Sequence, residues 1–114
     1  MSDAALLPHM LELAAIGPDR LPQDARKMAE LSLFVWMAVS LAGADQPLAH
    51  IIRDFVAAEG GVAKATVTGS KLRLPARAAA LANGTISHAL DYDDTHFAYI
   101  GHPSVAIFPA ALAA

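Results

Sequence analysis

The residues best suited to chemistry in this 114-residue chain lie close together, between Asn83 and Ser104. This segment holds three of the five histidines and three aspartates, whereas most of the chain is apolar. These residues are His88, Asp91, Asp93, Asp94, His96 and His102. Carboxylates and imidazoles that are crowded together favour proton exchange near neutral pH. The segment is therefore the candidate functional site.

Three interpretations of this cluster stay open from the residues alone. In the first, an aspartate and a histidine exchange protons with a substrate, and Gly101 and Pro103 shape the loop that holds the histidine. In the second, a divalent metal is bound by residues of this cluster, although their spacing differs from a strong signature such as His-Glu-x-x-His. The candidate ligands are His88, Asp91, Asp93, His96 and His102. In the third, the residues form only a solvated helix end and a polar loop.

The helix expected before the cluster decides which side chains face the same way. If its pattern continues to about Asp94, then His88, Asp91 and Thr95 follow at i, i+3 and i+7 and share one face. Asp93 would point elsewhere, at the end of the helix. The pattern thus predicts a site built on one helical face.

The motifs in this segment resemble the signature of the MmgE/PrpD family, which includes 2-methylcitrate dehydratase, cis-aconitate decarboxylase and iminodisuccinate epimerase. The signature lies in Asn83-Gly84, in the run from His88 to His96, and in Gly101-His102-Pro103-Ser104. Other segments also follow the order and spacing of residues in this family. They are Leu21-Pro22, Leu41-Ala42-Gly43, and the runs 65–69 and 77–84. The resemblance therefore spans nearly the whole chain.

The resemblance implies a metal-independent lyase, most similar to 2-methylcitrate dehydratase, that acts on small di- or tricarboxylates by proton transfer next to a carboxylate. Members of the family need neither a metal nor an organic cofactor. Compared residue by residue, His102 and Asp91 are the implied catalytic residues. His102 is the expected general acid or base, and Asp91 orients it or shares its proton. Thr95, His88 and Asn83 are the implied substrate-binding residues.

The resemblance also implies a wider organisation. Residues 1–114 look like the N-terminal portion of the family's helical domain, a single and incomplete domain of a longer, cytoplasmic, homodimeric enzyme. Further cations for the substrate are expected from later in that protein, so the 114-residue chain alone should be inactive. The alternatives are a decarboxylase or epimerase of the same family, a non-catalytic remnant that folds with a partner chain, and a metal-binding helical module.

The rest of the sequence predicts a mainly α, bundle-like fold with one short β-hairpin at about 62–74. Helices are expected at 4–16, capped by Ser2 or Asp3, at 22–42, at 47–59, and after Pro75. Alternating apolar and polar residues over 62–69 and 71–74 predict the two strands.

Two of these helices carry specific predictions about burial. Residues 31–42 are apolar almost all round, which predicts a helix buried on every side. The face of the helix at 47–59 that is expected to be buried consists of Leu48, Ile51, Ile52, Phe55 and Val56. Arg53 and Asp54 are expected to face solvent. Gly84 inside a helix costs about 1 kcal/mol relative to alanine, which indicates a packing or substrate role.

The composition limits the possible partners. A net charge of −3 and a pI near 5.9 argue against a nucleic-acid surface. The longest apolar run is too short to span a bilayer, so no membrane partner is expected. The absence of cysteine excludes disulfides and thiolate metal sites, and it fits a cytoplasmic protein. With 55% hydrophobic and 17% charged residues, the chain is expected to expose apolar patches and to oligomerise.

Overall fold

The computed structural model describes residues 6–98 and 100–114, so the predicted caps Ser2 and Asp3 lie outside the described residues. The chain divides into two compact units, residues 1–30 and 31–114. The first unit contains α1 (Leu6–Ala14), the 3-10 helix η2 (Pro18–Arg20) and the beginning of α2 (Gln23–Gly43).

Helix α1 lies within the range predicted for the first helix, 4–16. None of its residues is buried, and its leucines are between 54% and 65% exposed. The predicted exposure of apolar surface is therefore confirmed in this unit.

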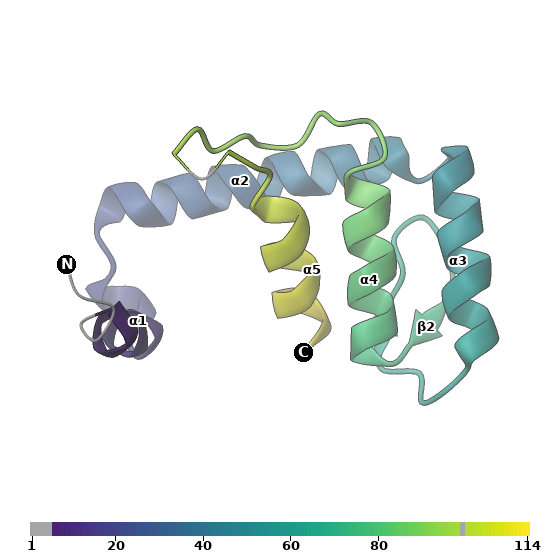
Figure 1. Cartoon of the computed structure of the whole chain (residues 1–114), viewed down its shortest axis with the longest axis horizontal. Helices are drawn as coiled ribbons and strands as arrows, with labels where there is room; N and C mark the ends of the chain where they lie inside the picture. Colours follow the sequence, from purple (N-terminus) through teal and green to yellow (C-terminus); the bar gives the residue numbers. More distant parts are fainter. Residues whose placement is uncertain (1–5, 99) are drawn as a thin grey trace. The chain divides into compact units, whose positions relative to one another are not determined.

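The second unit contains the rest of α2 and the remaining elements. These are α3 (Pro47–Glu59), β1 (Ala65–Thr66), β2 (Arg73–Leu74), α4 (Ala76–Ser87) and α5 (Ser104–Ala113). Helix α4 stands between α3 and α5 (Figure 1). The two strands pair antiparallel, with Ala65 opposite Leu74. The predicted mainly α fold with a hairpin inside 62–74 is confirmed.

The core of this unit forms where α4 packs against α3 and the hairpin. Its buried residues are Ala49, Val56, Val67, Leu74, Ala78, Ala79, Ala82 and Ile86. Half of them are alanines, so the backbones of neighbouring elements can approach closely. Gly43 at the end of α2 gives a similar contact, because a Cβ atom there would overlap the carbonyl oxygen of Ile86.

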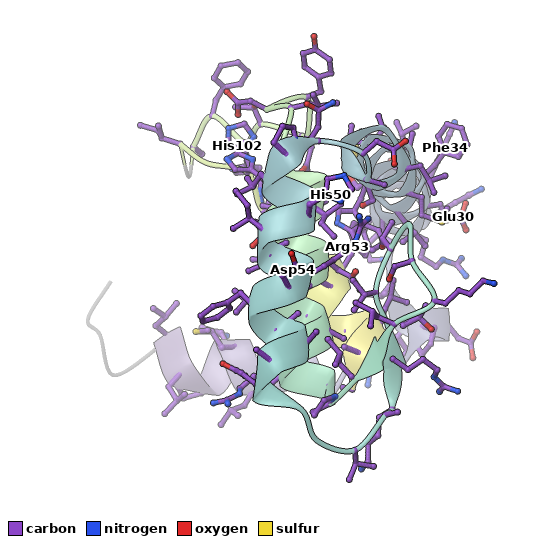
Figure 2. The ribbon with its side chains drawn as sticks, turned by 90° about the vertical axis from the view of Figure 1, so that its right-hand side faces the viewer. Glu30, Phe34, His50, Arg53, Asp54 and His102 are labelled. Carbon is purple, nitrogen blue, oxygen red and sulfur yellow. The ribbon has the colours of Figure 1, made fainter. Side chains whose placement is uncertain are left out.

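The hairpin is held from outside by two helices. Each strand has only two residues, too few for a hairpin to be stable by itself. Asn83 on α4 accepts a hydrogen bond from the backbone N–H of Thr68 at 2.8 Å and donates one to the carbonyl oxygen of Thr66 at 2.9 Å. Arg53 extends from α3 toward the hairpin (Figure 2) and donates to the carbonyl oxygen of Thr68 at 2.7 Å.

The predicted buried face of α3 is confirmed at Val56 and in part at Ile52, which packs against the core, and it is wrong at the other three residues. Arg53, expected outside, is only 8% exposed, and it forms the inner face with Ala49 and Val56. Three residues expected inside are exposed: Leu48, Ile51 and Phe55. The helix is rotated because the hairpin offers a backbone carbonyl to the Arg53 guanidinium, which can then be buried with a partner. Asp54 is exposed, as predicted.

The predicted burial of α2 on every side is also wrong. Its buried residues are Trp36, Ser40 and Gly43, whereas Phe34 and Leu41 are 66% and 68% exposed. The elements of the second unit cover only one side of the helix. Within residues 6–98 and 100–114, no single helix is long and apolar enough to cross a membrane. Helices α2 and α3 meet that test only as a pair, across a bend of 92°.

Candidate functional site

Helix α4 ends at Ser87, so its predicted continuation to about residue 94 is wrong. His88 caps the helix and donates its backbone N–H to the carbonyl oxygen of Gly84 at 3.2 Å. Asp91 then has a φ of 55°, a left-handed conformation that aspartate tolerates better than most residues. This turn breaks the helical spacing, and His88, Asp91 and Thr95 therefore do not share a helical face.

The loop over residues 88–103 returns the chain to α5 and is tied to that helix. Asp94 accepts hydrogen bonds from the backbone N–H and the hydroxyl of Ser104, at 3.2 and 2.7 Å. Ser104 is the first residue of α5. Farther along the loop, His96 donates its backbone N–H to the carbonyl oxygen of Gly101 at 2.9 Å. These ties bring His102 back toward the end of α4.

Asp93 lies at the centre of the polar cluster that results. Its side chain is fully buried, with 0% exposure, and its two oxygens face two different histidines. Oδ1 is hydrogen-bonded to Nδ1 of His88 at 2.9 Å, and Oδ2 lies 3.1 Å from Nδ1 of His102. The second contact is short enough for a hydrogen bond but is not aligned for one. Its two atoms have no hydrogen-bond partner among the described residues.

Asp91 lies on the open side of the same cluster. Its Oδ1 atom is 3.6 Å from Nε2 of His102 and 3.9 Å from Nδ1 of His88. The side chain of Asp91 is 75% exposed and that of His102 is 29% exposed. A small molecule in solution can therefore reach the Asp91 and His102 side chains, whereas Asp93 is closed off from solvent.

The structure brings together three of the five residues singled out in the sequence: His88, Asp91 and His102. The two imidazole rings lie 5.0 Å apart, tilted by 57°. Thr95 is an exposed residue of the loop. Asn83 is buried on α4, where its amide oxygen and nitrogen both bind the hairpin backbone.

The central position of Asp93 was missed because the helix was assumed to continue. On a continuous helix, Asp93 points away from the face that carries His88 and Asp91. The sequence shows three carboxylates in four residues, but it contains no signal that indicates which of them is buried. A fully buried aspartate is rare unless it is paired, and here two histidines provide the pairing.

The same side chains could also bind a divalent ion. His88, Asp91, Asp93 and His102 each offer one ligand atom, and these four atoms lie within 4.8 Å of one another. Imidazole and carboxylate donors suit zinc and several other divalent transition metals. The geometry thus supports two kinds of chemistry, proton transfer and metal binding.

Comparison with known protein families gives a match that covers most of the chain. The family profile described as the MmgE/PrpD N-terminal domain matches residues 13–114, a range that includes the whole polar cluster. No curated protein and no solved structure matches the chain significantly.

Proposed function

The chain belongs to the MmgE/PrpD family, and on this basis we propose that it forms the N-terminal part of a lyase for small di- or tricarboxylates. The favoured reaction is a dehydration similar to that of 2-methylcitrate dehydratase. A decarboxylation or epimerisation at a similar carbon atom is the alternative within the family. We further propose a homodimeric, cytoplasmic enzyme that needs no metal and no organic cofactor.

The observation that carries this proposal is the pair formed by His102 and Asp91. Nε2 of His102 faces Oδ1 of Asp91 at 3.6 Å, on the side of the cluster that solvent can reach. An imidazole and a carboxylate at this separation can exchange a proton with a substrate group placed beside them. The opposite side of the His102 ring faces the buried Asp93, so a substrate can approach only from the side of Nε2.

In the proposed dehydration, Nε2 of His102 removes a proton from the carbon atom next to a substrate carboxylate. The electron pair of that C–H bond forms a C=C bond, and the hydroxyl group on the neighbouring carbon leaves as water after it takes a proton from the protonated His102–Asp91 pair. Asp91 orients the imidazole and shares its proton, and Thr95 donates a hydrogen bond to the substrate. In this proposal His88 is a further substrate-binding residue, whereas Asn83 serves to hold the hairpin.

The substrate carboxylates need positive charge that this cluster does not supply in full. No lysine or arginine follows Arg77 in the sequence. A developing enolate requires hydrogen-bond donors or cations directed at it. We therefore propose that cationic groups outside the 88–104 segment complete the site, and that the 114-residue chain alone turns over substrate poorly.

The test is a lyase assay on the native gene product isolated from its source cells. The assay follows the absorbance of the C=C bond, which appears when 2-methylcitrate is dehydrated and changes when cis-aconitate is consumed. His102→Ala should lower the rate by about 10² to 10⁴, the usual contribution of a general acid or base. His50→Ala is the matched control, because His50 is an exposed histidine on α3. Equal rates for the His102→Ala variant and the native protein would refute the role of His102.

A further inference from the structure

We propose that Asp93 is a positioning residue that holds both histidines of the cluster in the Nδ1–H tautomer. For the catalytic meaning of this tautomer, the inference rests on the proposed function. The tautomer itself depends only on contacts inside the loop. Asp93 does not touch a substrate in this proposal and acts through His88 and His102.

The first reason is the symmetry of the contacts. Both histidines turn the same ring atom, Nδ1, toward Asp93, and each faces a different oxygen of the carboxylate. An ionised carboxylate can only accept hydrogen bonds, so Nδ1 of His88 is the donor in its 2.9 Å hydrogen bond, and Nδ1 of His102 must carry a proton for its 3.1 Å contact to become one. One buried side chain therefore specifies the proton position in two rings.

The second reason is the burial of the contact with His102. Nδ1 of His102 and Oδ2 of Asp93 are both shielded from water and lie 3.1 Å apart. If His102 carried its proton on Nε2, a nitrogen lone pair would face an oxygen lone pair at this distance. Each of these two buried polar atoms would then lack a hydrogen-bond partner, which is unfavourable. With the proton on Nδ1, a small rotation of the ring makes the hydrogen bond.

Asp91, the other carboxylate at the cluster, does not hold the Nδ1 protons; in the proposed reaction it shares only the proton that Nε2 of His102 accepts. Asp91 lies 3.6 Å from Nε2 of His102 and 3.9 Å from Nδ1 of His88, and both distances exceed a good hydrogen bond. Its side chain is also 75% exposed, so water can satisfy its oxygens. Asp94, the third aspartate, is bound to Ser104.

The consequence for His102 is a lone pair on the open side of the ring. With its proton fixed on Nδ1, a neutral imidazole presents an unprotonated Nε2 to the side where Asp91 lies. That atom is then ready to accept a proton. Without Asp93, the ring would favour the Nε2–H form that predominates for histidine in solution, which has no base on that side.

The experiment is long-range ¹H–¹⁵N NMR of the histidine rings in the ¹⁵N-labelled native gene product. Spectra are recorded with a chelator present, at a pH where the imidazoles are neutral. We expect His88 and His102 mainly in the Nδ1–H form, and the exposed His50 mainly in the Nε2–H form. A native chain with His102 mainly in the Nε2–H form would overturn the proposal, without the need for any variant.

Asp93→Asn then tests the cause. An asparagine side chain has only one acceptor oxygen, so at least one of the two rings should change to mainly Nε2–H. Asp94→Asn is the matched control, because it weakens the tie to Ser104 in the same loop and touches neither histidine. If Asp94→Asn changed the histidine tautomers as much as Asp93→Asn, the change would be due to a less ordered loop and not to the loss of the Asp93 carboxylate. That result would refute the proposal.

The result can be separated from that of the lyase assay. Nδ1–H histidines in a gene product without lyase activity would refute the proposed function and leave the positioning role of Asp93 intact. Lyase activity in a protein with His102 in the Nε2–H form would refute the positioning role of Asp93 and leave the proposed function intact.

Discussion

Replacing Gly84 with alanine should destabilise the second unit, although the same change in an open helix would stabilise it. Gly84 lies inside α4, at the contact with α5. A Cβ atom at this position would be 2.8 Å from the carbonyl oxygen of Val105 and 3.7 Å from Cγ of Pro109. The first of these neighbours is backbone, so it cannot move aside without moving α5.

Two opposing free energies decide the size of the effect. Alanine is favoured over glycine within a helix by about 0.5 to 1 kcal/mol. Ordinary contact begins near 3.4 Å, so the helices must separate by about 0.6 Å. Overpacking of this kind costs about 1 to 3 kcal/mol. The difference between these two ranges is about 0 to 2.5 kcal/mol, so the expected net loss in the free energy of unfolding is about 1 kcal/mol, or a Tm lower by about 5 °C for a domain of this size.

The measurement is urea and thermal unfolding of the Gly84→Ala variant against the unmodified chain. Gly17→Ala is the control, because nothing lies within 4 Å of its Cβ position and its φ is −69°. The control should change the free energy of unfolding by less than about 0.5 kcal/mol. A Gly84→Ala variant as stable as the unmodified chain, or more stable, would show that α4 and α5 are not in close contact.

Three further predictions concern the loop, the hairpin and the chemistry. Asn83→Ala removes both hydrogen bonds from α4 to the hairpin, so the free energy of unfolding in urea should fall by about 1 to 3 kcal/mol. An unchanged urea midpoint would show that these two hydrogen bonds do not stabilise the fold. Asp94→Ala should cost about 0.5 to 2 kcal/mol, as the loss of a helix cap does, and amide hydrogen exchange at the start of α5 should quicken. Lyase activity of the native gene product should persist in excess EDTA, whereas loss of activity that zinc restores would favour a metal site at His88, Asp91, Asp93 and His102.

The helix ends could be predicted where local residues determine them. α3 begins at Pro47 and ends at Glu59, as the sequence predicted. Proline is favoured in the first turn, and Gly60 adopts a φ of 68° that suits glycine best. These preferences act within a few residues, so the sequence alone is sufficient to find them.

The faces of the helices could not be predicted in the same way. The burial of Arg53 depends on the carbonyl oxygen of Thr68, fifteen residues away. The exposure of Phe34 depends on which elements surround α2. The burial of Arg53 and the exposure of Phe34 both depend on contacts between distant parts of the chain. The periodicity of apolar residues along one helix does not predict such contacts.

The candidate site was found in outline, but its centre was not. The density of histidine and aspartate identified the segment, and three of the five chosen residues do lie together. Asp93 reaches the centre only because the chain turns at Asp91 and because Asp94 binds Ser104. A left-handed turn at a residue other than glycine is hard to foresee, since few residues adopt one.

The way in which the hairpin is held has a consequence for how the sequence can vary. The side chains of Asn83 and Arg53 form hydrogen bonds with backbone groups of Thr66 and Thr68. None of these hydrogen bonds uses a threonine side chain. Most residues could stand at the two threonine positions and still offer the same N–H and C=O groups; proline at position 68 could not. In a library of all single substitutions, positions 66 and 68 should therefore accept many residues, while positions 53 and 83 should accept few.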